Sequence, residues 1–326
     1  MANTSLKPYR HASSFRRIAA VAWDEPRDPT IYGTVDVRAE ALLEWIDLKR
    51  RETGVRITVT HAVVRAVALT LAAHPDCNAV VRWGAPHLRH DVDVFAQVAI
   101  PREGGGSADL SGVCVRKADT KDIIAICDEL RAGSTRIRND EDKDFERTKG
   151  QAMILPGFIL RRVLRFLGFL QKVLNLDTTF LGAPRDPFGS AMVTSLGMMG
   201  IDQAYAPFFP LGNCALIVLV GAVNDTPVVE DGQLAVGKVF KLNATCDHRV
   251  IDGFHAAKMS AQIKRLLENP RLMESEADKL RAMGGPDPTT DLETLELDHT
   301  QDAPTTAEAP TVPGFDEVPP DRAQEE

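Results

Sequence analysis

The chain has 326 residues, 44% of them hydrophobic and 26% charged, an ordinary balance for a globular protein with a sizeable core. Its net charge of −8 is unevenly spread. Residues 286–326 hold 12 acidic residues and one Arg, which leaves 37 basic and 34 acidic residues before them. The slightly basic body is compatible with a phosphorylated ligand, and we expect no nucleic-acid partner. No run of about 18 apolar residues occurs, which excludes a predicted transmembrane helix.

Cysteine usage and the N-terminus indicate the compartment. The five cysteines are scattered and form no CxxC pair. We therefore expect reduced thiols and a cytoplasmic protein, and the N-terminal residues lack the apolar core of a signal peptide. The histidines show no spacing typical of metal ligands, so we expect no metal.

The first half of the chain alternates between strands and helices. Residues 1–20 are expected to form a polar arm, followed by a domain over residues 21–282. β-branched runs and helical apolar spacing predict, in chain order, strand 30–37, helices 39–54 and 58–74, strands 80–83, 92–101 and 111–117, and helix 120–137. This order lacks a strict βαβ rhythm. It predicts a two-layer α/β fold with a mixed β-sheet and helices rather than a doubly wound fold.

An apolar insert is expected at about residues 151–188. Its residues 158–176 are apolar with interspersed Arg and Lys, and the apolar positions can share one helical face. We favour a helix buried within an assembly of copies of this chain or against a neighbouring assembly. The alternatives are a helix touching membrane headgroups, which is less favoured, and a lid or channel wall. An apolar face of this size needs some covering surface.

The second half predicts strands 191–197, 214–222 and 236–245 and a final helix 253–269. Residues 283–326 are rich in Pro, Thr, Asp and Glu, which predicts a disordered acidic tail.

The segment CDHRVIDG, residues 246–253, carries the chemistry. It places His248 and Asp252 four residues apart, after a strand and before a glycine. Histidine has the unperturbed pKa nearest neutrality, so it suits proton removal from a thiol or hydroxyl. A Cys–His nucleophile using Cys246 is an alternative, which we disfavour because buried free cysteines are common. His255, early in the final helix, is expected to be structural.

Residues 242–272 resemble the acyltransferase catalytic domain of 2-oxo acid dehydrogenase complexes, the E2 component. That family shares its fold and its His-x-x-x-Asp-Gly signature with chloramphenicol acetyltransferase. The resemblance extends over about residues 8–282 and includes Arg16 and Arg17 and the run SLGMMG at residues 195–200. It implies a chloramphenicol acetyltransferase-like fold and a homotrimer whose active sites lie between subunits. It also implies acyl transfer between coenzyme A and a thiol, dihydrolipoyl-like or another small acceptor.

The resemblance assigns roles to particular residues. His248 would be the general base, and a hydroxyl of Thr194 or Ser195 would bind the oxyanion. Asp252 would hold the catalytic loop by pairing with an arginine. The choice between Thr194 and Ser195 stays open.

Two further residues complete the implied loop support. Arg16 or Arg17 is the expected partner of Asp252. Gly253 is expected to allow a close backbone approach where the last helix begins.

Departures from the family leave two other functions open. This chain carries no lipoyl domain and no lysine for lipoyl attachment, so we expect a separate lipoyl-bearing or dehydrogenase-complex partner. Ser195 stands where the family usually has Asn. One alternative is a catalytically inactive E2-like scaffold that assembles trimers into a larger particle, and another is a membrane-surface binding module.

Overall fold

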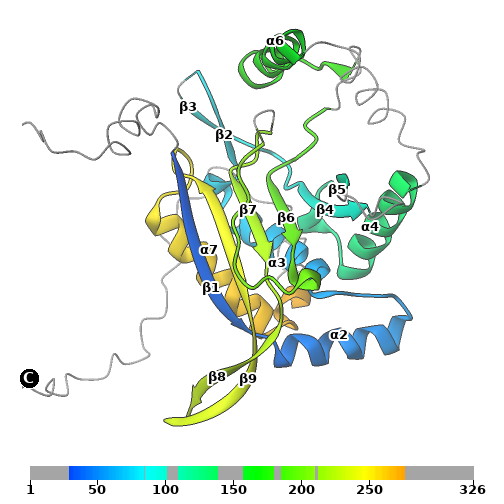
Figure 1. Ribbon diagram of the computed structural model, residues 1–326, viewed down its shortest axis with the longest axis vertical. Helices are drawn as coiled ribbons and strands as arrows, with labels where there is room; N and C mark the ends of the chain where they lie inside the picture. The colour runs from blue at the N-terminus through cyan, green and yellow to red at the C-terminus, as the bar shows by residue number, and fades with distance from the viewer. Residues whose placement is uncertain are drawn as a thin grey trace, which may run out of the picture. The chain divides into compact units, whose positions relative to one another are not determined.

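A seven-stranded mixed sheet forms the centre of the fold (Figure 1). The strands lie in the order β1-β9-β7-β6-β4-β5, and β8 pairs with β9. β6 runs parallel to β4 and β7, and the remaining pairs are antiparallel. Their bounds are β1 Thr30–Arg38, β4 Val94–Ile100, β5 Asp109–Val115, β6 Ala191–Ser195, β7 Leu216–Val220, β8 Asn224–Glu230 and β9 Gln233–Asp247. The predicted mixed sheet is confirmed.

This arrangement comes from a computed structural model, which describes residues 29–83, 85–100, 109–138, 157–179, 185–209 and 212–275. All of them belong to one unit, Met1–Pro286. The expected N-terminal arm, with Arg16 and Arg17, and the expected acidic tail lie outside the described residues.

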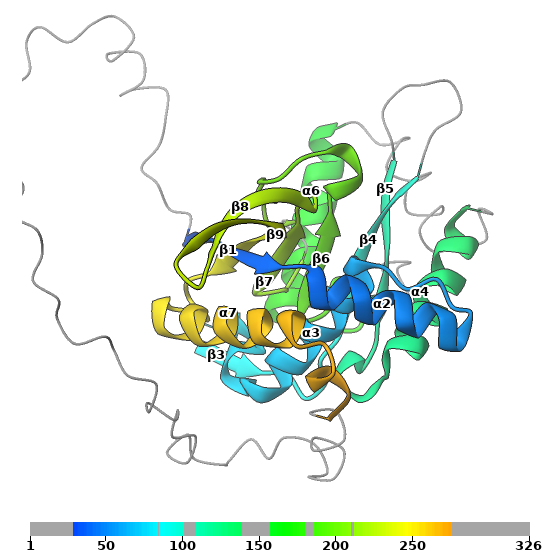
Figure 2. The ribbon, with the colours of Figure 1, turned by 90° about the horizontal axis from the view of Figure 1, so that it is seen from below.

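Four helices form the second layer (Figure 2). They are α2 Glu40–Thr53, α3 Val59–Ala73, α4 Ile123–Arg138 and α7 Gly253–Glu268. α3 packs on β4 and β6, α4 on β5, and α7 on β1. α3 is buried almost all round, as its apolar run predicts, and a capping box between Thr58 and His61 sets its first turn.

The two faces of the sheet differ in what covers them. Val193 and Val218 belong to the core under the helices, whereas Met192 and Ile217 belong to a second cluster on the other face. Because side chains alternate along a strand, Thr194 shares the face of Met192, opposite the helices. The face without helices therefore carries a buried hydroxyl.

Shorter elements complete the fold. They are the hairpin β2 Ala79–Arg82 and β3 Ala85–Leu88, the 3₁₀ turns η1 Pro75–Cys77, η2 Ala118–Thr120 and η5 Gly197–Met199, helix α6 Gly157–Gly168, and a π-helical turn η3 Phe169–Val173. α6 and η3 occupy the stretch predicted as one apolar helix. Among the described residues, no helix has the length and apolar character needed to cross a membrane.

The face predicted for burial on that helix is exposed within a single chain. Ile159, Val163 and Phe166 are all solvent-exposed, with Phe166 60% accessible. They lie at helical spacing, so together they form one apolar stripe. Burial of this stripe requires a surface outside the chain.

β8 and the first part of β9 form a hairpin that runs on past the other strands (Figure 1). Its turn residues Asp231 and Gly232 both have positive φ, 50° and 78°, as tight hairpin turns require. Val229, Leu234 and Val236 on this hairpin are exposed. The hairpin is thus a second apolar surface.

Candidate active site

His248 occupies the tight turn that follows β9. Its backbone N–H donates to the carbonyl of Pro29 at 2.8 Å, which ties the turn to the residue before β1. The backbone N–H groups of Val250 and Ile251 both donate to the carbonyl of Asp247 at 2.9 Å. The turn is held by its backbone, and the His248 side chain is exposed to solvent.

The imidazole of His248 is oriented by one contact. Its Nδ1 lies 3.1 Å from the carbonyl oxygen of Ile251. A carbonyl oxygen can only accept a hydrogen bond, so Nδ1 carries the proton in the neutral ring. Nε2 is then unprotonated, and its lone pair is available to take a proton. This is the tautomer that a general base needs.

Asp247 and Arg249 brace the same turn. The Asp247 carboxylate accepts the backbone N–H of Arg249 at 3.0 Å, its Nε at 2.9 Å and its Nη2 at 2.6 Å. Burial disfavours the charged carboxylate, but these hydrogen bonds outweigh burial and lower the pKa of Asp247. The ionised pair fixes the residues on either side of His248.

The loop continues into α7 through Ile251 and Asp252. The Ile251 side chain is fully buried, which anchors the carbonyl that orients His248. Asp252 is the N-cap of α7, and its Oδ1 accepts the backbone N–H of His255 at 2.9 Å. That hydrogen bond lowers the pKa of Asp252.

The loop support expected from Asp252 and an arginine is untested by the described residues. Asp252 contacts His255 among the described residues, while Arg16 and Arg17 lie outside them, so the arginine pairing stays a prediction. A Cβ added to Gly253 would meet no atom within 4 Å. The close approach predicted at Gly253 is therefore wrong within a single chain, because the start of α7 faces open space there.

Thr194 and Ser195 close β6 at the far end of the sheet from His248. Ser195 pairs with Val220, which pairs with Leu242 of β9. His248 follows six residues after Leu242, and a strand rises about 3.3 Å per residue, so the two sites lie roughly 20 Å apart. The structure does not bring the predicted base and hydroxyls together within one chain.

Cys246 is not a nucleophile partner for His248. β9 continues to Asp247, so Cys246 lies on the helix-facing side of the sheet and is buried. Burial raises the pKa of its thiol to about 11. The side chain lines an apolar cavity of about 250 Å³ between β1, β7, β9 and α7. A thiol in this setting is inert at neutral pH.

One lysine of the insert interacts with charged residues of the turn that carries His248. Burial lowers the pKa of Lys172 in η3, and the charges of Arg249 and Asp247 act on the same ammonium group. η3 therefore lies near the turn that carries His248. Sequence patterns alone gave no sign of this proximity.

The sequence profile of the family "2-oxoacid dehydrogenases acyltransferase (catalytic domain)" matches residues 13–154 and 188–274. These ranges make up well over half of the chain, and the chain belongs to this family. The match passes over residues 155–187, the stretch in which the sequence predicts an apolar insert.

Individual relatives and solved structures agree with this family. A dihydrolipoyllysine-residue acetyltransferase component of the pyruvate dehydrogenase complex from Zymomonas mobilis is 27% identical over 263 residues, which cover 79% of this chain and 49% of the relative. The chain thus spans about half the length of the curated relatives it matches. A probable dihydrolipoamide acetyltransferase from Listeria monocytogenes has a TM-score of 0.54 at 19% identity, covering 82% of this chain and 96% of the other.

The cubic core of a pyruvate dehydrogenase multienzyme complex is also similar in structure. Its TM-score is 0.56 at 18% identity, covering 76% of this chain and 84% of the other. At these identities the likeness concerns the fold, and it confirms the predicted α/β architecture.

Proposed function

We propose that the chain is an acyltransferase that moves an acyl group between coenzyme A and a thiol, either a dihydrolipoyl-like group or another small acceptor. The observation that carries this proposal is the orientation of His248. Its Nδ1 is committed to the Ile251 carbonyl, and its exposed ring leaves Nε2 free as a base. Membership of the acyltransferase family supports the reaction class.

In the proposed reaction, Nε2 of His248 takes the proton from the attacking thiol. The sulfur adds to the carbonyl carbon of the acyl thioester and forms a tetrahedral oxyanion. Collapse of the oxyanion breaks the old carbon–sulfur bond, and the leaving thiolate recovers the proton from the imidazolium. A thiol of pKa near 8.5 is mostly protonated at pH 7, so a positioned base accelerates the attack by about 10²–10⁴-fold.

A hydroxyl donor to the oxyanion would come from a neighbouring copy. His248 and the end of β6 lie at opposite ends of the sheet, so one chain does not supply both groups to one site. Thr194 and Ser195, at the end of β6, are the two candidates. Thr194 lies on the face opposite the helices and is buried within a single chain, whereas Ser195 is half-buried. One such donor contributes about 3 kcal/mol to the barrier.

The complete active site therefore needs an assembly, and a homotrimer provides three equivalent seams. Coenzyme A is a substrate in this scheme, and a separate lipoyl-bearing protein or a dehydrogenase complex is the proposed partner. All five cysteines are free in the structure, which supports a reducing, cytoplasmic location.

The direct experiment measures acetyl transfer from acetyl-CoA to dihydrolipoamide by the purified chain. We expect His248→Gln to lower kcat/KM by about 10²–10⁴-fold. His90→Gln, a change at another exposed histidine, is the matched control and should leave the rate unchanged. Equal rates for the wild type and His248→Gln would refute the assignment.

Complementation tests the subunit seam. Mixed assemblies of His248→Gln and Thr194→Val chains should regain activity, because some seams then combine an intact base with an intact hydroxyl. Mixtures with Ser195→Ala in place of Thr194→Val decide between the two hydroxyls. Mixtures that stay as inactive as their separate components would show that the site is not shared between copies.

The exposed apolar surfaces favour a second candidate, an inactive scaffold. Phe166 of α6 and Leu234 and Val236 of the hairpin are solvent-exposed in a single chain, as expected for surfaces that join copies. Acyl transfer by the wild type separates the two functions, because a scaffold forms a particle of defined native mass but transfers no acyl group.

A further inference from the structure

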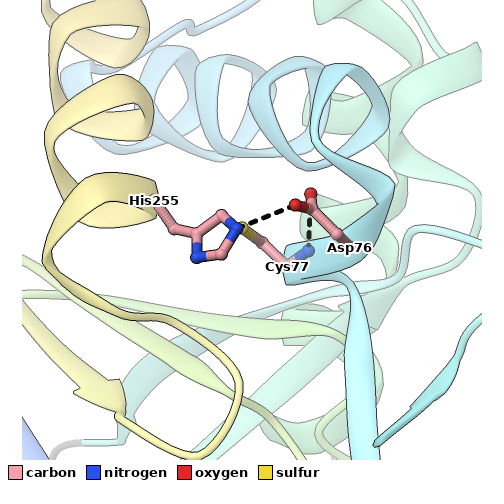
Figure 3. Close-up of side chains that lie close together, drawn as sticks. All are labelled: Asp76, Cys77 and His255. Atoms are coloured by element: carbon pink, nitrogen blue, oxygen red, sulfur yellow. Dashed lines mark hydrogen bonds and ion pairs between the residues drawn. The ribbon is translucent and has the colours of Figure 1, made fainter. Parts of the chain in front are cut away.

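Asp76, Cys77 and His255 come together beside the first turn of α7 (Figure 3). Asp76 and Cys77 belong to η1, immediately before β2, and His255 is the third residue of α7. One carboxylate oxygen, the thiol sulfur and one imidazole nitrogen all lie within 4.8 Å of one another. Cys77 is buried, and the other two are half-buried, so solvent reaches the edge of the cluster.

The ring of His255 faces a carboxylate on each side. Nε2 lies 2.9 Å from Asp76 Oδ2, and Nδ1 lies 2.8 Å from Asp252 Oδ1. Nδ1 is a buried nitrogen that makes no hydrogen bond. A neutral imidazole carries a single ring proton, so its other nitrogen has a lone pair that can ligate a metal ion.

The three side chains fit a transition-metal cation. Asp76 Oδ1 accepts the backbone N–H of Cys77 at 3.1 Å, which leaves Oδ2 directed at the imidazole. The Cys77 sulfur lies within 4.8 Å of both the carboxylate and the imidazole (Figure 3). A thiolate, an imidazole and a carboxylate are the ligands that Zn²⁺ takes, whereas Ca²⁺ and Mg²⁺ select oxygen alone.

We propose that Asp76, Cys77 and His255 bind one divalent transition-metal ion of the Zn²⁺ type. The ion replaces the proton of the thiol and occupies the Nε2 lone pair, and water completes the four-coordinate shell. Asp252 Oδ1 lies 2.8 Å from the opposite ring nitrogen, where its negative charge would favour a cation bound at Nε2.

The ion would join η1 to the first turn of α7, which directly follows the loop that carries His248. Asp252 follows Ile251, whose carbonyl orients His248, so a clamp on the first turn of α7 also steadies that carbonyl. The site is a binding and bracing site, and its existence does not depend on the proposed acyl transfer.

The test uses the full chain, stripped with a chelator and titrated with Co²⁺. We expect one Co²⁺ per chain, a thiolate-to-cobalt charge-transfer absorption, and loss of that absorption when Zn²⁺ is added. Cys77→Ser should abolish the absorption. Cys127→Ser changes another buried free thiol, in α4, and should leave the absorption intact.

A second variant and a second readout keep the proposal testable if Cys77→Ser fails to fold. His255→Gln changes a half-buried side chain and should weaken Co²⁺ binding by at least about 10-fold. Zn²⁺ should raise the melting temperature of the wild type and not of His255→Gln. Absence of stoichiometric binding, or an absorption that survives Cys77→Ser, overturns the metal site. These experiments measure metal binding and stability alone, so neither result tests the proposed acyl transfer.

Discussion

Acidification should destabilise the fold through one histidine at the start of α3. Nδ1 of His61 accepts the backbone N–H of Thr58 at 3.0 Å, so protonating Nδ1 breaks this capping contact. Burial, followed by the charges of Arg131, Arg50 and Arg56, lowers the pKa of His61 to about 4. In the unfolded chain the ordinary value of about 6.5 returns.

The direction and size of the change in the free energy of unfolding follow from these two pKa values. Below pH 6.5 His61 is protonated in the unfolded chain but stays neutral in the folded chain. The free energy of unfolding therefore falls as the pH falls. The stability is fully present above about pH 6.5 and is lost progressively toward pH 4. Each pH unit inside that window costs about 1.4 kcal/mol, which gives about 2 kcal/mol between pH 6.5 and 5.

Urea unfolding at pH 7 and pH 5, at one fixed protein concentration, measures this loss. His61→Gln keeps a side-chain acceptor at the capping-box position and does not titrate. We expect the pH-dependent loss to shrink by about 2 kcal/mol in His61→Gln and to be unchanged in the exposed control His90→Gln. The reasoning fails if His61→Gln loses as much stability as the wild type over the same interval.

Three further predictions concern packing, and urea unfolding measures each. Ile251→Ala removes a fully buried side chain beside an existing cavity and should cost about 2–5 kcal/mol, against about 1 kcal/mol for Ile251→Val. Gly221→Ala places a Cβ 2.2 Å from the Asp202 carbonyl oxygen and should cost at least about 2 kcal/mol. Arg65→Met leaves two η2 carbonyls without the donor Arg65 Nη1, which binds them at 3.0 and 2.8 Å, and should lower the free energy of unfolding by about 2–4 kcal/mol. For each variant, a urea midpoint within error of the wild type would contradict the predicted contribution of that contact to stability.

The sequence predicted the elements whose signals are local. Helix α3 and the apolar strand β7 both lie within two residues of their predicted bounds. Strand β8 was missed because Pro227 and the short polar start of Asn224–Glu230 weaken the alternation. The dipeptide Asp231-Gly232 is a hairpin signal that could have located it.

The functional residues, too, were predicted only where the signal is local in the sequence. The His248 motif is contiguous, so the sequence alone identified the turn, whereas the role of Asp252 as the N-cap of α7 was not predicted. The cluster of Asp76, Cys77 and His255 was not predicted, because it joins positions far apart in the chain and only the packing of η1 against α7 brings them together. Which face of β6 carries Thr194 also depends on the sheet register, which no local pattern specifies.

The position of β1 has a consequence for synthesis on the ribosome. Within the part of the chain that the structure describes, its sheet neighbour is β9, and Thr30 pairs with Asp247. At about 5–20 residues per second, translation needs roughly 10–40 s to reach that partner after β1 emerges. During this interval the nascent chain presents an unpaired edge, so holding chaperones should engage it early and release it only when the final helix has been made.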